Sequence, residues 1–180
     1  VLLQVLEEFD HKHLNLDLPY FERQIPTSEN VARVLWDKLQ AQPDIGTLQR
    51  LSLYEDEDLC ADLTAEAGPE VASVTRRYSF TAVHDGHRGH TWDLFVSVHG
   101  PIDRETGMVT DIVALDHLLK ERVLVPFDGR DLRMVLATPS VTGEYLAKAV
   151  WDRIVSAIPA GTLQLVKLVQ TRDLFYEYAG

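Results

Sequence analysis

The sequence predicts an α+β fold in which the order strand–strand–helix–helix–strand–strand occurs once in full and once in its second half. Two observations carry this prediction. An internal repeat relates the back of the chain to the front. In the back half, hydrophobic residues also switch between the two-residue period of strands and the ~3.6-residue period of helices. The predicted domains are 1–67, the second half of a first copy, and 68–180, a complete second copy.

The repeat is clearest in the segment GTLQ, which stands at 46–49 and returns unchanged at 161–164, an offset of 115 residues (161 − 46). The segment FDHKHLN at 9–15 returns as FDGRDL at 127–132 with an offset of 118 (127 − 9), so Gly129 stands where His11 stands. A length difference in a loop is typical of two copies of one fold. Further matches at offset 115 are Thr27 with Thr142, Glu29 with Glu144, Ala32 with Ala147, and Trp36-Asp37 with Trp151-Asp152.

The first 67 residues are predicted to hold the end of one helix, a second helix and a pair of strands. Residues 1–9 continue a helical pattern, and 10–26 form a loop with two prolines. Thr27 or Ser28 can cap the next helix, which ends before Pro43 and Gly46. Its apolar stripe is Val31, Val34, Leu35 and Leu39. Leu48, Leu51 and Leu53 begin a strand region, and 61–70 form a short strand that runs into a linker.

The second copy opens with two strands that alternate cleanly. One face of the first strand holds Tyr78, Phe80, Ala82 and His84, and one face of the next holds Trp92, Leu94, Val96 and Val98. The turn-rich segment GPIDRETG at 100–107 follows. Helices are predicted over 112–125 and 140–158, and two closing strands over 162–179.

Composition narrows the class of partner. The net charge is −11, which disfavours a nucleic-acid partner because phosphate backbones need clustered Lys and Arg. No apolar run approaches the roughly 20 residues of a membrane span. A single cysteine, Cys60, fits a reducing cytoplasm. The start has no signal-peptide pattern and no initiator Met and lies within a helical pattern, which indicates a fragment or a processed piece.

Three histidines fall within seven residues of the segment YSFTAVHDGHRGHTW at 78–92. These are His84, His87 and His90. Three imidazoles with an open fourth position describe a catalytic zinc site. The alternative is a polar turn that happens to be rich in histidine, and the spacing leaves both open.

The motifs FTAVH (80–84), GHTWDLFVSVHG (89–100), GMVTDIVALDHLLK (107–120), FDHKHLN, PTSEN (26–30) and LYED (53–56) occur in this chain. Together they resemble the 6-pyruvoyl- and 6-carboxy-tetrahydropterin synthase family. The resemblance implies the tunnelling fold, an antiparallel four-stranded sheet with two helices on one face. It also implies a small pterin substrate, no membrane, and a homo-oligomer that closes a barrel with sites between units.

The resemblance implies Zn²⁺ held by three histidines, and His84 and His90 match the first and third. Arg88 stands at the second place, where arginine cannot act as a ligand, so His87 is the remaining candidate. The family's cysteine base is missing from the shortened loop at 85–88, and Cys60 lies elsewhere, where a small apolar core residue is expected.

The resemblance also implies catalysis by an Asp-His pair, matched by Asp10 and His11, in which the carboxylate orients the imidazole. A pterin-anchoring glutamate is matched by Glu55, with Gln170 at the same place in the second copy. Thr27 and Glu29, from PTSEN, complete the predicted substrate-binding residues. Read without the family, Asp10-His11 is a loop pair, and Glu55 is one acid of an exposed acidic run.

Three functions therefore follow. The first is a lyase of pterin biosynthesis that eliminates triphosphate from 7,8-dihydroneopterin triphosphate. The second is a non-catalytic scaffold or pterin-binding protein of the same fold, favoured by Arg88, Gly129, Gln170 and the missing cysteine. The third keeps the fold and changes the chemistry, since fold alone does not fix a reaction. In each, the second copy keeps its fold and has lost site residues.

Overall fold

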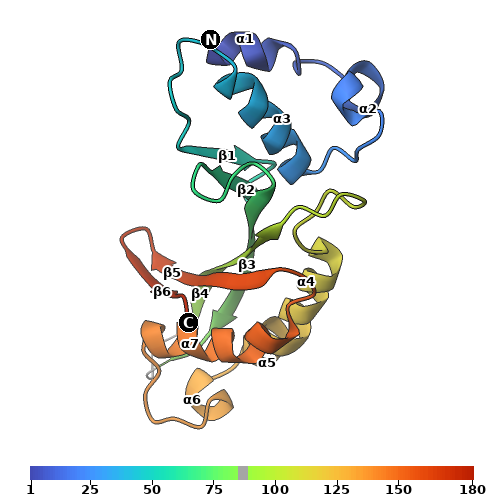
Figure 1. Cartoon of the computed structure of the whole chain (residues 1–180). Helices are drawn as coiled ribbons and strands as arrows, with labels where there is room; N and C mark the ends of the chain where they lie inside the picture. Colours follow the sequence, from blue (N-terminus) through green and yellow to red (C-terminus); the bar gives the residue numbers. More distant parts are fainter. Residues whose placement is uncertain (85–88) are drawn as a thin grey trace. The chain divides into compact units, whose positions relative to one another are not determined.

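A computed structural model describes residues 1–84 and 89–180 (Figure 1). The chain divides into two compact units, each described here by itself. Unit 1 comprises 1–74 and 99–109, and unit 2 comprises 75–98 and 110–180. Strands β3 (Val71–Ala82) and β4 (His90–Pro101) contribute residues to both units. Within the described residues, no helix is both long and apolar enough to cross a bilayer.

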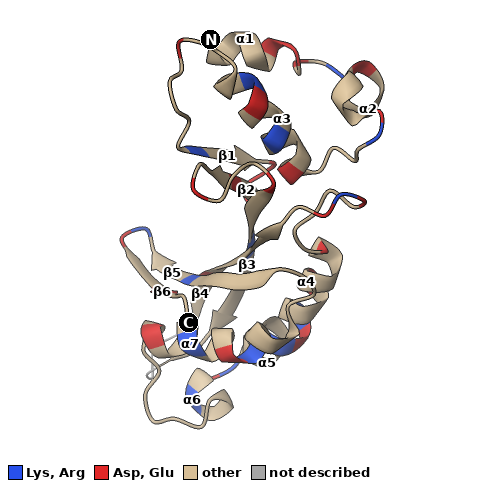
Figure 2. Cartoon of the chain, in the orientation of Figure 1, with Lys and Arg blue, Asp and Glu red and all other residues tan. Residues whose placement is uncertain are grey.

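Unit 1 is built around α3 (Ser28–Gln40) and the hairpin of β1 (Arg50–Tyr54) and β2 (Leu59–Thr64). The hairpin is antiparallel, with Leu53 opposite Ala61 and Tyr54 opposite Cys60. Acidic and basic residues are interspersed along α3 (Figure 2). The apolar face of α3 packs on α1 (Leu2–Glu7) and on the hairpin. The resulting core contains Val5, Leu35 and Leu39, with Phe9, Val31, Ile45, Leu48, Leu51 and Leu53 around them.

The segment predicted as loop, 10–26, is more ordered than expected. It forms one helical turn, α2 (Leu14–Asp17), and a short 3₁₀ helix, η1 (Pro19–Phe21). The Asp17 carboxylate accepts a 2.8 Å hydrogen bond from the backbone N–H of His13 at the start of α2. The Phe21 side chain is buried. The expectation of a plain loop was wrong because local capping and one aromatic anchor order short turns that carry no periodic pattern.

Unit 2 has the strand–strand–helix–helix–strand–strand order that the sequence predicts. Strands β3 to β6 follow one another in the sheet, where β5 is Thr162–Thr171 and β6 is Leu174–Tyr178. Between β4 and β5 lie α4 (Ile112–Leu119), the π-helical η2 (Lys120–Leu124), α5 (Val125–Phe127), α6 (Leu132–Val135), α7 (Gly143–Ile154) and η3 (Val155–Ala157). The second of the two predicted helices corresponds to α7, which packs on β5 and β6.

The core of unit 2 follows the predicted faces. Trp92, Leu94, Val96 and Val98 of β4 are all at most 1% exposed. The helices bury Leu115, Leu119, Phe127, Leu146, Val150 and Ile154. Phe80 of β3 packs edge-on to Phe127, with ring centroids 5.7 Å apart. The unit therefore has the predicted α+β fold, with helices packed on a sheet. The expected count of four strands differs from the sheet as a whole, which has six strands, β1 to β6 in chain order.

Candidate functional site

Residues at the start of α3 and the end of β1 meet in unit 1. Thr27 caps α3: its Oγ1 accepts a 3.2 Å hydrogen bond from the backbone N–H of Asn30. Glu55 comes directly after β1, and its Oε2 accepts a 2.5 Å hydrogen bond from the Ser28 hydroxyl. We call Thr27, Ser28, Glu29 and Glu55 the α3 cluster. Three of its members, Thr27, Glu29 and Glu55, are predicted from the sequence, and they lie close together with Ser28 in unit 1.

The segment after β4 lies against the α3 cluster within unit 1. The Thr27 hydroxyl donates a 2.5 Å hydrogen bond to the Gly107 carbonyl. The backbone N–H of Val109 donates a 3.0 Å hydrogen bond to Glu29 Oε1. Gly107 has a positive φ of 72°, and a Cβ there would lie 2.3 Å from Asn30 Nδ2. This close approach requires glycine at position 107.

Glu29 is therefore a structural acid as well as a predicted substrate contact, because its side chain is 4% exposed. Burial raises its pKa above the usual value, although the hydrogen bond from Val109 acts in the opposite direction. The nearby Glu55 carboxylate adds a smaller rise to the pKa of Glu29. The Glu55 side chain, in contrast, is exposed. Of the two acids, Glu55 is the one accessible to a ligand.

We predict that the stability of unit 1 depends on pH through Glu29. An acid whose pKa is raised by folding stabilises the fold when protonated, and this stabilisation is lost as pH rises from 4.5 through the folded-state pKa. Glu29→Gln keeps an acceptor for Val109 and cannot ionise. Relative to the parent chain, Glu29→Gln should therefore be more stable at pH 7 than at pH 4, seen as a larger free energy of unfolding in urea denaturation.

Glu144→Gln is the matched control for the Glu29 prediction. Glu144 holds the corresponding place in the first turn of α7 and is exposed. It controls for losing an acidic charge near a helix N-terminus. An identical pH dependence in both variants would contradict the role of burial at Glu29.

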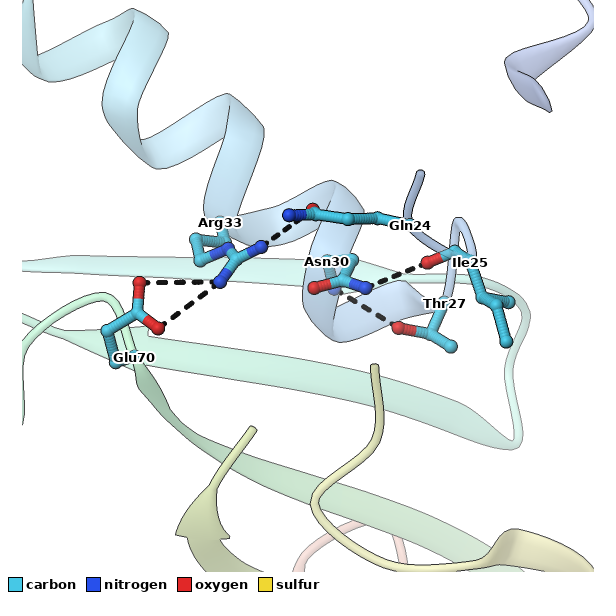
Figure 3. Close-up of polar contacts among 6 residues, drawn as sticks. All are labelled: Gln24, Ile25, Thr27, Asn30, Arg33 and Glu70. Atoms are coloured by element: carbon cyan, nitrogen blue, oxygen red, sulfur yellow. Dashed lines mark hydrogen bonds and ion pairs between the residues drawn. The ribbon is translucent and has the colours of Figure 1, made fainter. Parts of the chain in front are cut away.

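Beside the α3 cluster, unit 1 has a surface pocket of about 290 Å³ lined by polar side chains, namely Gln24, Asn30, Arg33, Glu70 and Arg104. The Arg33 guanidinium is paired on two sides, with Glu70 at 3.2 Å and with the Gln24 amide oxygen at 2.7 Å (Figure 3). Asn30 Nδ2 donates to the Ile25 carbonyl. These contacts fasten α3 to the segment before it and to the residue before β3. Arg33 is thus a structural residue.

The predicted catalytic pair, Asp10 and His11, lies in a different part of unit 1. The imidazole Nε2 of His11 is 3.7 Å from Asp10 Oδ2, and their side chains are 94% and 69% exposed. Within the described ranges, no hydrogen bond or ion pair joins them to the α3 cluster. His11 has a positive φ of 54°, close to the 68° of Gly129. The two matched segments therefore share a left-handed backbone.

The matched segment of unit 2, which contains Asp128 and Gly129, shows what can lie beside such a backbone. Asp128 Oδ1 accepts a 2.9 Å hydrogen bond from the Thr81 backbone N–H, and the Gly129 N–H donates at 2.7 Å to the Thr81 carbonyl. For Asp10 and His11, the described residues contain no corresponding strand. This difference accounts for the exposure of the predicted pair.

The predicted metal ligands belong to unit 2. The rings of His84 and His90 are 6.4 Å apart, and the Trp92 ring lies 5.3 Å from each. His90 Nε2 lies 2.6 Å from the Gln170 carbonyl, which can only accept, so Nε2 carries the proton of this bond. His87 lies outside the described residues. Within the described part, no group of three His, Cys, Asp or Glu could hold a metal.

A catalytic zinc site needs three protein ligands. Among the described residues, only two predicted ligands are present, His84 and His90, and Nε2 of His90 is hydrogen-bonded to the Gln170 carbonyl. They do not make a zinc site by themselves, so the predicted Zn²⁺ stays a prediction that depends on His87. Cys60 is buried as expected, and burial, followed by the nearby Asp62 carboxylate, raises its pKa to about 11. Its thiol is protonated near neutrality and cannot serve as the missing base.

Comparison with known proteins agrees with this architecture. A family model described as 6-pyruvoyl tetrahydropterin synthase matches residues 1–66 and 74–180. The 6-pyruvoyl tetrahydrobiopterin synthases of Pongo abelii and Homo sapiens are 32% and 31% identical over 134 residues, covering 61% of this chain and 92% of theirs. The structure of the Caenorhabditis elegans 6-pyruvoyl tetrahydropterin synthase has a TM-score of 0.57 at 23% identity, over 61% of this chain and 96% of that one.

The fold is the tunnelling fold, which the C. elegans structure shares. The family match covers most of the chain, residues 1–66 and 74–180. The chain belongs to the 6-pyruvoyl tetrahydropterin synthase family.

Proposed function

We propose that this chain is a lyase of pterin biosynthesis that acts on 7,8-dihydroneopterin triphosphate, as a cytoplasmic homo-oligomer. Family membership supports the class of reaction. The observation that carries the substrate class is the Glu55 carboxylate. It is exposed, its Oε2 is held by Ser28, and within the described residues its Oε1 accepts no hydrogen bond.

A carboxylate of this kind suits the edge of a pterin ring. The pterin 2-amino group and the adjacent ring N–H are parallel donors, and an ionised carboxylate accepts two such bonds side by side. Glu55 would bind and orient the ring at this edge. Asp10 and His11 are proposed for proton transfer, since histidine exchanges a proton near neutral pH. No step of the proposed reaction is assigned to a metal.

The tandem arrangement is part of the proposal. We propose that 1–67 and 68–180 are two copies of one module, of which the earlier binds substrate. The match of the family model in two stretches supports this. So do the threonine caps of α3 and α7, Thr27 and Thr142. Barrel closure removes exposed sheet edges, which supports a homo-oligomer.

The test replaces the anchor and leaves its surroundings intact. Glu55→Gln removes one acceptor and the charge, which costs about 1.5–3 kcal/mol for hydrogen bonds to a charged group. We expect the dissociation constant for 7,8-dihydroneopterin to rise about 10- to 100-fold, measured by fluorescence titration. Glu57→Gln removes an exposed acid from the same turn and should leave binding unchanged. Equal affinity of Glu55→Gln and the parent chain would exclude Glu55 as the anchor.

A pterin-binding protein without turnover is the second candidate. It is favoured by the exposed Asp10-His11 pair and by the protonated Cys60 thiol. Incubation with 7,8-dihydroneopterin triphosphate, followed by chromatography, separates the two functions. Release of triphosphate with a 6-pyruvoyl or 6-carboxy product supports the lyase. Binding without either product supports the second candidate.

A further inference from the structure

The chain contains two hairpins of the same design, which permits an internal comparison. Each has a GTLQ segment at or just before its first strand, and each packs on a helix capped by threonine. At the offset of 115, Leu53 corresponds to Leu168 (53 + 115). Leu53 is opposite Ala61 on β2, and Leu168 is opposite Tyr176 on β6. Ala61 and Tyr176 therefore hold the same place in the two hairpins.

In the first copy, this place holds a small residue, Ala61. Ser28 is 8% exposed and opens α3, and its hydroxyl donates to Glu55 Oε2 at 2.5 Å. The pairing joins a nearly buried donor on a helix to an exposed carboxylate on a turn. Glutamate has three side-chain torsions, so an unheld carboxylate loses entropy when it binds a planar ligand. The hydrogen bond from Ser28 reduces that loss.

In the second copy, the corresponding residues are changed together. Gly143 stands at the place of Ser28 and Gln170 at the place of Glu55, by the same offset (28 + 115 and 55 + 115). The Tyr176 ring occupies the space where a side chain at 143 would lie, since a Cβ there would be 2.1 Å from the ring. The Tyr176 hydroxyl donates to Gln170 Oε1 at 3.4 Å. The anchor place of the second copy is thus filled by an aromatic ring of the chain itself.

We propose that Ser28 is a positioning residue for Glu55, which fixes the plane of the carboxylate for a ligand that presents two parallel donors. The proposal rests on the proposed function. The second copy supplies the internal support: where the glutamate has become Gln170, the serine has become Gly143, and Tyr176 closes the space between them. Ser28 and Glu55 occur together in the first copy, and both are replaced in the second copy, by Gly143 and Gln170.

The test measures the dissociation constant for 7,8-dihydroneopterin by fluorescence titration in the full chain. Ser28→Ala should weaken binding about tenfold, with the thermal unfolding midpoint unchanged, because the hydroxyl acts on the carboxylate. Ser28→Thr keeps the hydroxyl and should restore affinity. Ser52→Ala is the matched control, since Ser52 also donates to a carboxylate, that of Asp62, in the same hairpin.

A double-mutant cycle separates positioning from general support of the fold. If Ser28 acts through Glu55, Ser28→Ala should add no loss to Glu55→Gln, whereas independent effects would add. Additive losses, or equal affinities of Ser28→Ala and the parent chain, would overturn the positioning role of Ser28 and leave the proposed function standing. Failure of the parent chain to bind the pterin overturns the proposed function and this proposal with it.

Discussion

Gly107→Ala is expected to lower the stability of unit 1 by about 3 kcal/mol or more. Two separate effects contribute to this loss of stability, one from the backbone and one from packing. A φ of 72° costs a non-glycine residue about 1–2 kcal/mol. A Cβ would also lie 2.3 Å from Asn30 Nδ2 and 3.2 Å from Thr27 Oγ1, and such overpacking adds about 1–3 kcal/mol. Urea denaturation, monitored by circular dichroism, measures the loss.

Gly46→Ala separates these two contributions. Gly46 has a similar φ of 70°, but a Cβ there would meet nothing within 4 Å. The control should therefore show the backbone cost alone, about 1–2 kcal/mol. The excess at Gly107 then measures how tightly the segment after β4 lies on the α3 cap. Equal losses at the two glycines would contradict that close contact. In the Gly107→Ala variant, pterin affinity should fall as well, because Asn30 and Thr27 must move.

Gly143→Ala is expected to destabilise unit 2 by about 1–3 kcal/mol, the usual range for overpacking. The added Cβ would lie 2.1 Å from two atoms of the Tyr176 ring. The ring cannot simply turn away, because it also packs near Trp92, with centroids 6.3 Å apart. Thermal and urea unfolding of the single variant measure the cost.

The Tyr176→Ala background tests the cause of this loss. Without the ring, the space next to position 143 is empty, so Gly143→Ala should cost nothing and should even gain about 0.4–1 kcal/mol, because alanine restricts the unfolded chain more than glycine does. The coupling between the two substitutions is the informative quantity. An equal cost in both backgrounds would show that Tyr176 does not restrict position 143.

Much of the fold could be predicted because its signals are local. The threonine cap of α3, the apolar stripe behind it and the alternation in β4 each lie within a short window of sequence. Glu55 was selected through the resemblance to the family's anchoring glutamate, and the structure places it directly after a strand. The sequence repeat added a relation between distant segments, such as the two GTLQ segments, that no short window contains.

Other parts of the site depend on partners far away in the sequence. Glu29 is held by Val109, which is 80 residues later, and nothing in PTSEN indicates that the carboxylate is buried. Ser28 was predicted only as a possible cap, because its partner Glu55 comes from another element. The change of Ser28 to Gly143 at the offset of 115 was the one available signal. Tyr176 becomes meaningful only through the register of β5 and β6.

The shared left-handed backbone of His11 and Gly129 has a consequence for how this family can change. Glycine usually marks a conformation that other residues avoid, yet a histidine adopts it in the earlier segment. A side chain at 129 would meet nothing within 4 Å. The single substitution Gly129→His could therefore place an imidazole beside Asp128 with little rearrangement of the main chain. Position 143 differs, because the Tyr176 ring occupies the space that a side chain there would need.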